Sequence, residues 1–191
     1  MNPLVHVSIG LHIANLGFYQ RYGRRASLIL ATASLFPDID SVSLFISRDT
    51  YYAYHRAFTH ALGGWVLCGA MLALLTAHHD LKRWFLIDWG LWAIGMAGHT
   101  AADIITRWPI PVFYPLSERS WSFALVSWGD AFLTTIWPGL ALAAAVWPKR
   151  RRFLSAIAVA MGLLYLAYRI AVPAPGPSWL SQIWFGLWFR W

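Results

Sequence analysis

Apolar residues fill most of this chain in six long stretches separated by short polar turns. The stretches run over residues 3–19, 26–46, 58–77, 84–105, 128–147 and 153–172. Several approach the roughly 20 residues that a helix needs to cross the hydrocarbon core of a bilayer. The pattern therefore predicts an all-α, polytopic membrane bundle of about six short or broken transmembrane helices.

Two parts of this pattern depart from simple membrane helices. The second stretch is interrupted at residues 37–40 by Pro-Asp-Ile-Asp, where a proline and two carboxylates are expected to break the helix. After residue 172, three prolines end the last helix, and the Trp-rich tail within residues 173–191 is predicted to lie in the membrane interface. Because no linker or repeat divides the chain, residues 1–191 are expected to form a single domain.

The composition agrees with a membrane environment. Of the 191 residues, 59% are hydrophobic and only 12% are charged, whereas a water-soluble domain has about 25% charged residues. The first residues lack the basic start and the small-residue cleavage pattern of a signal peptide, so the first stretch is expected to stay as an anchor. The single cysteine, Cys68, excludes a disulfide within the chain.

The net charge of +7 comes from Lys and Arg residues that gather in three short turns. The clusters are Arg21 with Arg24 and Arg25, Lys82 with Arg83, and residues 149–152. Each cluster follows every second apolar stretch, so all three face the cytoplasm together under the positive-inside rule, and no nucleic-acid partner is needed to explain the charge. The N-terminus, the loops at 47–57 and 107–127 and the C-terminal tail are then expected on the other side.

Five polar residues that are costly in hydrocarbon fall at similar depths in this arrangement. An Asp at the centre of a membrane helix costs roughly 3 kcal/mol and needs a partner or a function. Counted at about 1.5 Å per residue from the nearest basic cluster, the five lie roughly 20–33 Å away from it. They are His6, Asp38, His60, His99 and Asp130. The sequence therefore predicts one shared polar layer near the non-cytoplasmic face.

The local spacing of these residues suits metal ligands. His99 and Asp103 are four residues apart, so they project from one face of a helix. Asp38 and Asp40 follow a proline, and an extended or turning backbone there lets both carboxylates reach one or two ions. A metal site between helices is therefore predicted.

A pair of histidines precedes the third apolar stretch. His55 and His60 are five residues apart, a poor helical spacing, so His55 is expected in a loop and His60 in the first turn of the next helix. Imidazole and carboxylate ligands together favour Zn, Mn or Fe over Ca or Mg. Seven or eight such ligands exceed the needs of one tetrahedral ion, so the site is predicted to hold two divalent ions, with Zn favoured, about 3.5–4 Å apart.

Arginines on the expected site side are candidates for binding substrate, because the guanidinium group recognises phosphate through its planar fork. Arg56, which lies between the two histidines, is the best phosphate candidate, and Arg119 and Arg169 are further candidates. For Arg169, snorkelling to the outer interface is an equal explanation. Asp130 has the right depth but no neighbouring ligand, and it is a candidate ligand or outer carboxylate.

Other polar positions have structural explanations. His12 is expected to be a packed or hydrogen-bonded histidine, since it lies on another helix face than the layer requires. His78 adjoins the basic turn at Lys82, where solvent accounts for it. Asp88 lies near the same turn, and an ion pair with Lys82 or Arg83 is expected.

The ordered set of motifs resembles the YdjM-type family of inner-membrane proteins. The resemblance rests on the early histidine His6 and on LFPDIDS (35–41), HRAFTHA (55–61), GHTAAD (98–103) and PIPVFYPLS (109–117), and it covers about residues 1–135. It implies a metal-dependent hydrolase of the inner (plasma) membrane. The ligands that it implies are His6, Asp38, Asp40, His55, His60, His99 and Asp103.

Together these features predict a membrane-embedded, metal-dependent hydrolase acting on a lipid or lipid-linked substrate, with a phosphate-containing substrate favoured. A carboxylate among Asp40, Asp103 and Asp130 would serve as general base. The main alternative is a transporter or channel that binds ions in transit, although mostly Ala, Leu, Ile and Trp separate the layer from the basic clusters. The third alternative is a partner-binding membrane protein with a purely structural metal.

Overall fold

All six apolar stretches form helices in the computed structural model, which describes residues 1–172. The α-helices are α1 (Pro3–Ile13), α2 (Tyr19–Tyr22), α3 (Arg24–Ala33), α4 (Arg48–Tyr54), α5 (Leu62–Thr76), α6 (Leu81–Ile104), α7 (Ala131–Val146) and α8 (Arg151–Ala171). The π-helix η1 (Ala14–Phe18) joins α1 to α2, and the 3-10 helices η2 (Phe36–Phe45) and η3 (Pro148–Arg150) follow α3 and α7. The prediction of an all-α fold is confirmed for the described residues, and the predicted interfacial tail lies outside them.

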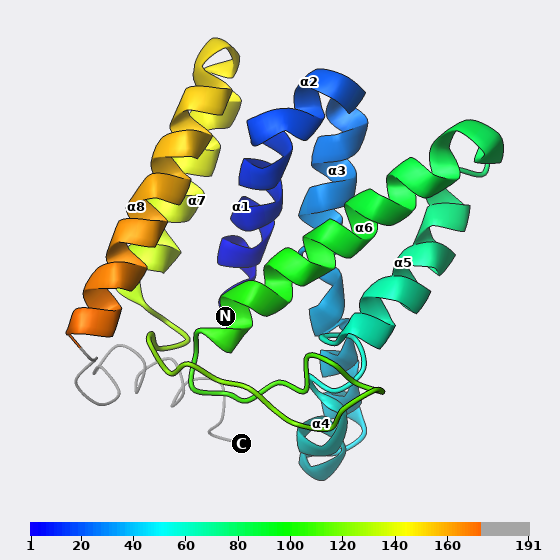
Figure 1. Ribbon diagram of the computed structural model, residues 1–191, viewed down its shortest axis with the longest axis vertical. Coiled ribbons are helices and arrows are strands. Elements are labelled where there is room, and N and C mark those ends of the chain that lie inside the picture. Colours follow the sequence, from blue (N-terminus) through cyan, green and yellow to red (C-terminus); the bar gives the residue numbers. More distant parts are fainter. Residues whose placement is uncertain (173–191) are drawn as a thin grey trace.

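Helix α1 lies at the centre of the bundle. It contacts α3, α6, α7 and α8, with the α7–α8 hairpin on one side and α3 on the other (Figure 1). Helix α6 runs obliquely across the bundle and packs against α3 and α5. One apolar cluster, around Leu30, Leu91 and Met96, lies between α3, α5 and α6, and a second, around Val5 and Leu133, lies between α1, α7 and α8.

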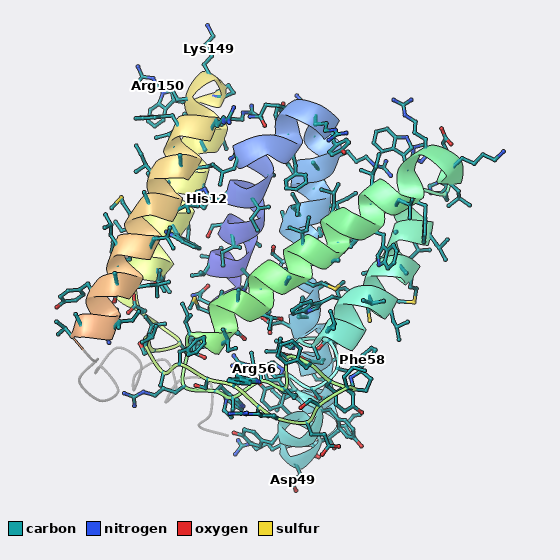
Figure 2. All side chains as sticks on the ribbon, in the orientation of Figure 1. His12, Asp49, Arg56, Phe58, Lys149 and Arg150 are labelled. Carbon is teal, nitrogen blue, oxygen red and sulfur yellow. The ribbon has the colours of Figure 1, made fainter. Side chains whose placement is uncertain are left out.

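The three basic turns lie at one end of the bundle. They are at α2, between α5 and α6, and between α7 and α8, and together they carry nine of the 15 Lys and Arg residues (Figure 1). Lys149 and Arg150 mark this end in Figure 2, and Asp49 and Arg56 lie at the opposite end near α4. The helical hairpins thus bring the basic clusters together, as their spacing along the sequence predicts.

Two segments of the described chain, Arg24–Phe45 and Pro148–Ala171, are long and apolar enough to cross a membrane. Leu62–Thr76 and Ala131–Val146 are shorter apolar helices. Many large apolar side chains on these segments point outward, including Leu67, Leu142 and Leu164. Such outer faces suit a lipid environment.

The chain leaves the α-helical path before Pro37, as its sequence predicts. Helix α3 ends at Ala33, because Pro37 has no N–H to donate to the Ala33 carbonyl. The N–H of Asp38 then bonds to the Leu35 carbonyl at 3.3 Å, as in a 3-10 helix, instead of reaching the Ser34 carbonyl. The carbonyl of Ser34 is thereby left available to a side chain.

The segment between α6 and α7, residues 105–130, covers the end of the bundle opposite the basic turns; we call it the cover loop. It contains one antiparallel bridge, between Ile110 and Trp121. The carbonyl of Val112 accepts the N–H of Leu62 at 2.8 Å, so the loop caps the start of α5. Helix α4 lies at the same end, where only a loop was expected, and the Ser47 side chain caps its N-terminus.

Glycine and alanine allow α1, α3 and α6 to approach closely. A Cβ atom at Gly95 on α6 would overlap Ala33 and lie 3.1 Å from the carbonyl oxygen of Leu30. A Cβ atom at Gly10 on α1 would overlap the backbone of Leu30 as well. Small residues of this kind let membrane helices cross at short distance, and here they bring the end of α3 against the middle of α6.

A Gly95→Leu substitution is expected to destabilise the protein by about 1–3 kcal/mol or more, because the added side chain has to displace α3. The measurement is unfolding of the purified protein in detergent. Gly90→Leu is the matched control on the same helix, since nothing lies within 4 Å of a Cβ atom at Gly90. Equal stabilities of the two variants would contradict the close crossing of α3 and α6.

Candidate metal centre

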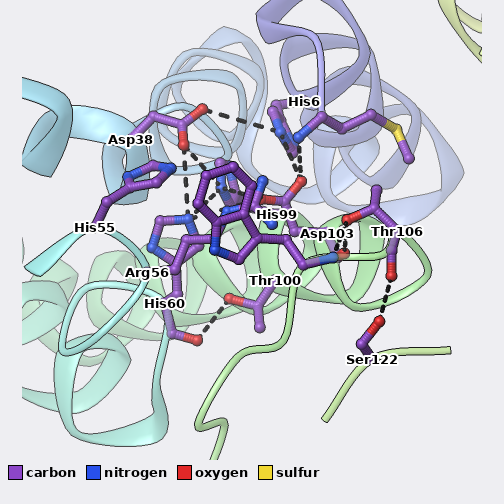
Figure 3. A network of polar contacts seen from close by, with 12 residues as sticks. His6, Asp38, His55, Arg56, His60, His99, Thr100, Asp103, Thr106 and Ser122 are labelled. Carbon is purple, nitrogen blue, oxygen red and sulfur yellow. Dashed lines mark hydrogen bonds and ion pairs between the residues drawn. The ribbon is translucent and has the colours of Figure 1, made fainter. Parts of the chain in front are cut away.

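Four side chains converge at the end of the bundle opposite the basic turns (Figure 3). Asp38 comes from η2, His60 from the turn before α5, and His99 and Asp103 from α6. Each offers one ligand atom, and the four atoms all lie within 4.8 Å of one another. His60, His99 and Asp103 are fully buried, whereas the side chain of Asp38 is 25% exposed. The structure thus brings together side chains that the sequence placed at one depth.

The distances among these atoms fit a tetrahedral metal ion. Nε2 of His60 lies 3.0 Å from Nε2 of His99. Asp38 Oδ1 is 3.6 and 3.5 Å from these two nitrogens, and Asp103 Oδ2 is 3.8 Å from each. Ligand atoms bound to a tetrahedral ion at about 2.0–2.1 Å are separated by roughly 3.4 Å. Five of the six separations are thus near that value, and the sixth, between the two carboxylate oxygens, is within 4.8 Å, so the side chains would shift to bring all four atoms onto one ion.

Both histidines present lone pairs to this site. Nδ1 of His99 lies 2.7 Å from the carbonyl oxygen of Ser34, the group that the helix break leaves available. Because a carbonyl only accepts, His99 donates through Nδ1, and its Nε2 keeps a lone pair. Nδ1 of His60 lies 3.1 Å from Thr59 Oγ1 and 3.5 Å from Asp40 Oδ2, so its Nε2 also faces the site. Two lone pairs and two carboxylate oxygens face one another, and a cation satisfies all four.

The electrostatics of His60 also favour positive charge here. Burial lowers the pKa of His60, but its contacts with Asp38 and Asp40 outweigh burial and raise the pKa above its usual value. The surrounding carboxylates therefore stabilise a positive charge, whether a proton on the ring or a metal ion beside it.

Asp40 organises the turn that carries His60. Its Oδ1 lies 2.7 Å from Nδ1 of His55, and its Oδ2 accepts the backbone N–H of Arg56 at 3.0 Å and the hydroxyl of Thr59 at 2.8 Å. These contacts fix the turn between α4 and α5. Outer carboxylates commonly orient the histidines that bind a metal in this way.

The expected ligands Asp40 and His55 lie outside the four-atom group. A 3-10 helix has three residues per turn, so Asp40 is turned away from the direction of Asp38. His60 also departs from expectation: α5 starts two residues later, and the histidine lies in the turn before it. The hydroxyl of Thr100 on α6 holds that turn by donating to the His60 carbonyl at 2.8 Å.

Aromatic rings from α4 and the cover loop enclose the outer side of this turn. Tyr51 stacks on His55 with 4.5 Å between ring centroids, and Trp108 meets the edge of His55 at 6.0 Å. Burial raises the pKa of Tyr51 to about 12, so its phenol stays neutral at physiological pH. These rings shield the histidine–carboxylate contacts from water.

His6 on α1 adds ligand atoms beside the first group. Its ring is fully buried and stacks on His99 at 3.7 Å, and neither ring nitrogen has a hydrogen-bond partner among the described residues. Nε2 of His6 lies 3.4 Å from Asp103 Oδ1 and 4.0 Å from Asp38 Oδ2, the oxygens that the four-atom group does not use. The amino group of Met1 also contacts Asp103 Oδ1. His6 thus lies against both carboxylates, where it would add a ligand atom if a second ion were bound.

Asp130 lies apart from this cluster and has another role. As the N-cap of α7, it accepts the N–H of Leu133 on Oδ1 at 3.1 Å. Its Oδ2 accepts the hydroxyl of Tyr165 at 2.6 Å, which ties α7 to α8. Helix capping and the bond to Tyr165 account for this carboxylate, which the structure does not bring into the four-atom group.

Among the three candidate arginines, Arg56 is the one that the structure brings to the cluster, where it forms an ion pair with Asp103. Arg119 is exposed and lies over the ring of Trp121 in the cover loop. Arg169 donates from Nε to the carbonyl of Leu125 at 2.9 Å, so it fastens α8 to the cover loop. The predicted depth of Arg169 thus did not indicate the direction in which its side chain points.

The remaining buried polar residues have partners of their own. His12 is hydrogen-bonded, as expected: Nδ1 lies 3.0 Å from Ser155 Oγ and Nε2 lies 3.1 Å from the Trp137 carbonyl oxygen. Asp88 pairs with Arg25 of α3, whose Nε donates to Oδ1 at 2.9 Å, and not with the basic residues of its own turn. That partner is adjacent in space because α3 packs on α6, which the sequence pattern alone does not indicate.

Several residues that position the ligands were missed by sequence reasoning. Ser34 orients His99 through its backbone, which leaves no side-chain signal. Thr59 and Thr100 did carry a signal in the sequence, because each is a polar residue next to a candidate ligand histidine in an otherwise apolar stretch.

The fold and the cluster define an all-helical, membrane-type bundle with a buried His/Asp centre able to hold a metal ion. The chain belongs to the YdjM inner membrane protein family, whose family model matches residues 1–174. No curated protein matches the chain, and no solved structure matches it. Membership of this family agrees with the inner-membrane location predicted from the sequence.

Loss of a ligand should remove bound metal. His60→Ala and Asp103→Ala are each expected to weaken metal binding more than about 100-fold, because both remove an atom of the four-atom group, whereas the loss of an outer partner typically costs about 10–100-fold. The measurement is metal content of the purified protein by elemental mass spectrometry. His78→Ala, at an exposed histidine, is the control. Full metal content in both ligand variants would disprove the centre.

Proposed function

We propose that this protein is a membrane-embedded, metal-dependent hydrolase that acts on a lipid or lipid-linked ester. The observation that carries the proposal is the four-atom group, two imidazole lone pairs and two carboxylate oxygens held inside the fold of an inner membrane protein. Such a group is costly in an apolar interior unless a cation is bound. Its donor set suits Zn, with Mn and Fe as alternatives.

The first ion would be held by His60, His99, Asp38 and Asp103. A second would be held by His6 together with the remaining oxygens of the two ligand carboxylates. When bound, such ions lower the pKa of water toward about 7 and polarise the oxygen of the ester to be cleaved. The protein supplies a rigid frame for this chemistry, because His99 and His60 are each oriented by a hydrogen-bond partner and His6 is held by stacking on His99.

Two carboxylates remain candidates for the proton acceptor. Asp40 and Asp103 both lie at the centre, and either would take the proton that water releases when it attacks the ester. Asp40 has the additional task of holding His55 and the backbone of Arg56 in place. Asp103 is engaged as well, with His6 and Arg56, so either carboxylate would combine proton transfer with positioning.

The position of the basic turns supports six crossings of the inner membrane by a single multi-pass domain. By the positive-inside rule, the end that carries α2 and the α5–α6 and α7–α8 turns faces the cytoplasm. The metal centre, α4 and the cover loop then lie near the non-cytoplasmic face. α5 and α7, with 15 and 16 residues, are short for a bilayer core and would cross where it is locally thin.

The exposure of the centre supports a substrate that arrives from the bilayer. Asp38 is the ligand that is partly exposed, so the centre opens beside η2. The residues Ile39, Val42 and Phe45 follow the three-residue period of that helix and form an outward apolar face, with exposed fractions of 52%, 59% and 94%. Hydrocarbon chains would lie against this face while a polar head group reaches the centre.

The rival functions are less well supported. An ion passing to the cytoplasmic end needs free polar groups along its path, but His12 and Asp88, the buried candidates there, are hydrogen-bonded to Ser155 and Arg25. A purely structural metal needs closed coordination. The partly exposed Asp38 and the neighbouring His6 favour an accessible centre instead.

The proposed orientation can be tested with single cysteines in a Cys68→Ser background. Asp49→Cys and Lys149→Cys place thiols at exposed positions on opposite ends of the bundle (Figure 2). A thiol reagent that cannot cross the inner membrane should label position 49 in cells with a permeable outer barrier and position 149 only after lysis. The reverse pattern would place the centre on the cytoplasmic side.

The proposed activity can be tested with purified, Zn-loaded protein and mixed bacterial lipids. Mass spectrometry should detect the loss of one lipid class and the appearance of its hydrolysis products, and His60→Ala and Asp103→Ala should reduce the rate more than about 100-fold by removing the metal. His78→Ala should hydrolyse like the unaltered protein. A metal-loaded protein that cleaves no lipid, polyprenyl phosphate or ester would disprove the hydrolase proposal.

A further inference from the structure

Arg56 occupies an unusual position beside the metal centre. It is only 4% exposed and lies in the turn between α4 and α5 with a φ of 68°, a left-handed conformation that non-glycine residues rarely adopt. Its backbone N–H is held by Asp40 Oδ2 at 3.0 Å. The turn therefore keeps a charged side chain inside the protein at the expense of backbone strain.

The guanidinium group of Arg56 is only partly satisfied there. Nη2 lies 2.7 Å from Asp103 Oδ2, and the group lies over the ring of Trp108 at 5.1 Å. Nε and Nη1 are buried and have no hydrogen-bond partner among residues 1–172. Buried N–H groups of a cation are rarely left without an acceptor, so these two nitrogens have donors to offer to a ligand.

The charges around Arg56 indicate the sign of that ligand. The carboxylates of Asp38 and Asp103 together balance one divalent ion, and Asp40 is engaged with His55. The positive charge of Arg56 is then left over next to the ion. A ligand that binds both the ion and Arg56 needs at least two acceptor oxygens and a negative charge.

We infer that Arg56 forms an anion subsite of the metal centre and that the group it selects is a phosphoryl group. This inference rests on the proposed function and narrows its substrate class to phosphoric esters. A phosphoryl group places one oxygen on a metal ion and another on the free guanidinium nitrogens. The carbonyl oxygen of a neutral carboxylic ester would accept from these N–H groups, but it brings no negative charge to balance the buried guanidinium.

The test measures binding of inorganic phosphate to Zn-loaded protein in detergent by calorimetry. Arg56→Gln is expected to weaken phosphate binding about 10–100-fold, the typical loss for a charge-assisted contact, while metal content stays unchanged. Arg119→Gln, at an exposed arginine, is the matched control and should leave the affinity within about twofold. Phosphate binding by Arg56→Gln equal to that of the unaltered protein would overturn the inference.

A second variant distinguishes two roles of Arg56, binding an anion and only neutralising the charge of Asp103. Arg56→Lys keeps a positive charge for the carboxylate but not the guanidinium fork, so it should retain metal and still lose phosphate affinity at least about fivefold. If Arg56→Gln loses metal while Arg56→Lys binds phosphate like the unaltered protein, Arg56 serves only to neutralise Asp103, and the subsite is disproved.

Lipid competitors identify the source of the phosphoryl group. Phosphatidylglycerol in mixed micelles should displace inorganic phosphate, and diacylglycerol should not. Displacement by neither lipid would show that free phosphate alone fits the subsite, and it would overturn the narrowing of the substrate class to phosphoric esters. The two proposals fail separately. A protein that binds Zn and cleaves a carboxylic ester but has no phosphate affinity would refute the subsite alone, whereas a protein that binds no metal would refute the proposed function.

Discussion

Hydrocarbon offers no partner to a buried carboxylate or imidazole, and the architecture of this protein depends on that constraint. Isolated in a membrane helix, each such group would be costly, so stable packing requires groups from different segments to meet. Asp38, His60, His99 and Asp103 do so within 4.8 Å. The same constraint pairs Asp88 with Arg25 and His12 with Ser155 in the other half of the bundle. Polar contacts thus set which helices are neighbours, and apolar packing fills the space between them.

The break at Pro37 connects the fold to the centre. A continuous α-helix would bond the Ser34 carbonyl to the N–H of Asp38, and His99 would lose the acceptor that fixes its tautomer. The 3-10 helix that replaces it also separates the directions of Asp38 and Asp40, so one carboxylate reaches the metal position and the other organises the His55–His60 turn. One proline therefore sets three features of the site, which is why this segment is irregular where a membrane helix would be the default.

The sequence was sufficient for the helices and for the end of the bundle at which the ligand candidates gather, because both follow from distances along the chain. It was insufficient for direction around each helix axis. Asp130 and Arg169 were expected in the same layer, yet the first caps α7 and the second binds a loop carbonyl. The pairing of Asp88 with Arg25 could not be predicted for the same reason, because this contact depends on how α3 crosses α6. Periodic spacing resolved direction only where two ligands share one helix, as His99 and Asp103 do.

The carboxylates of the centre stabilise positive charge, which Arg56 and His60 supply when no metal ion is bound. Without a metal ion, the carboxylates keep Arg56 against Asp103 and favour a proton on His60. An ion that neutralised Asp38 and Asp103 would leave the charge of Arg56 without a counterpart in the described part of the chain, and burial would keep water from solvating it. An unpaired guanidinium is costly in the apolar interior, and an anion that paired with Arg56 would remove this cost. The relief would add to the binding free energy of the anion. The proposed metal site and the proposed anion subsite are thereby coupled through Asp103, whose Oδ2 lies 3.8 Å from Nε2 of both His60 and His99 and also forms the ion pair with Arg56.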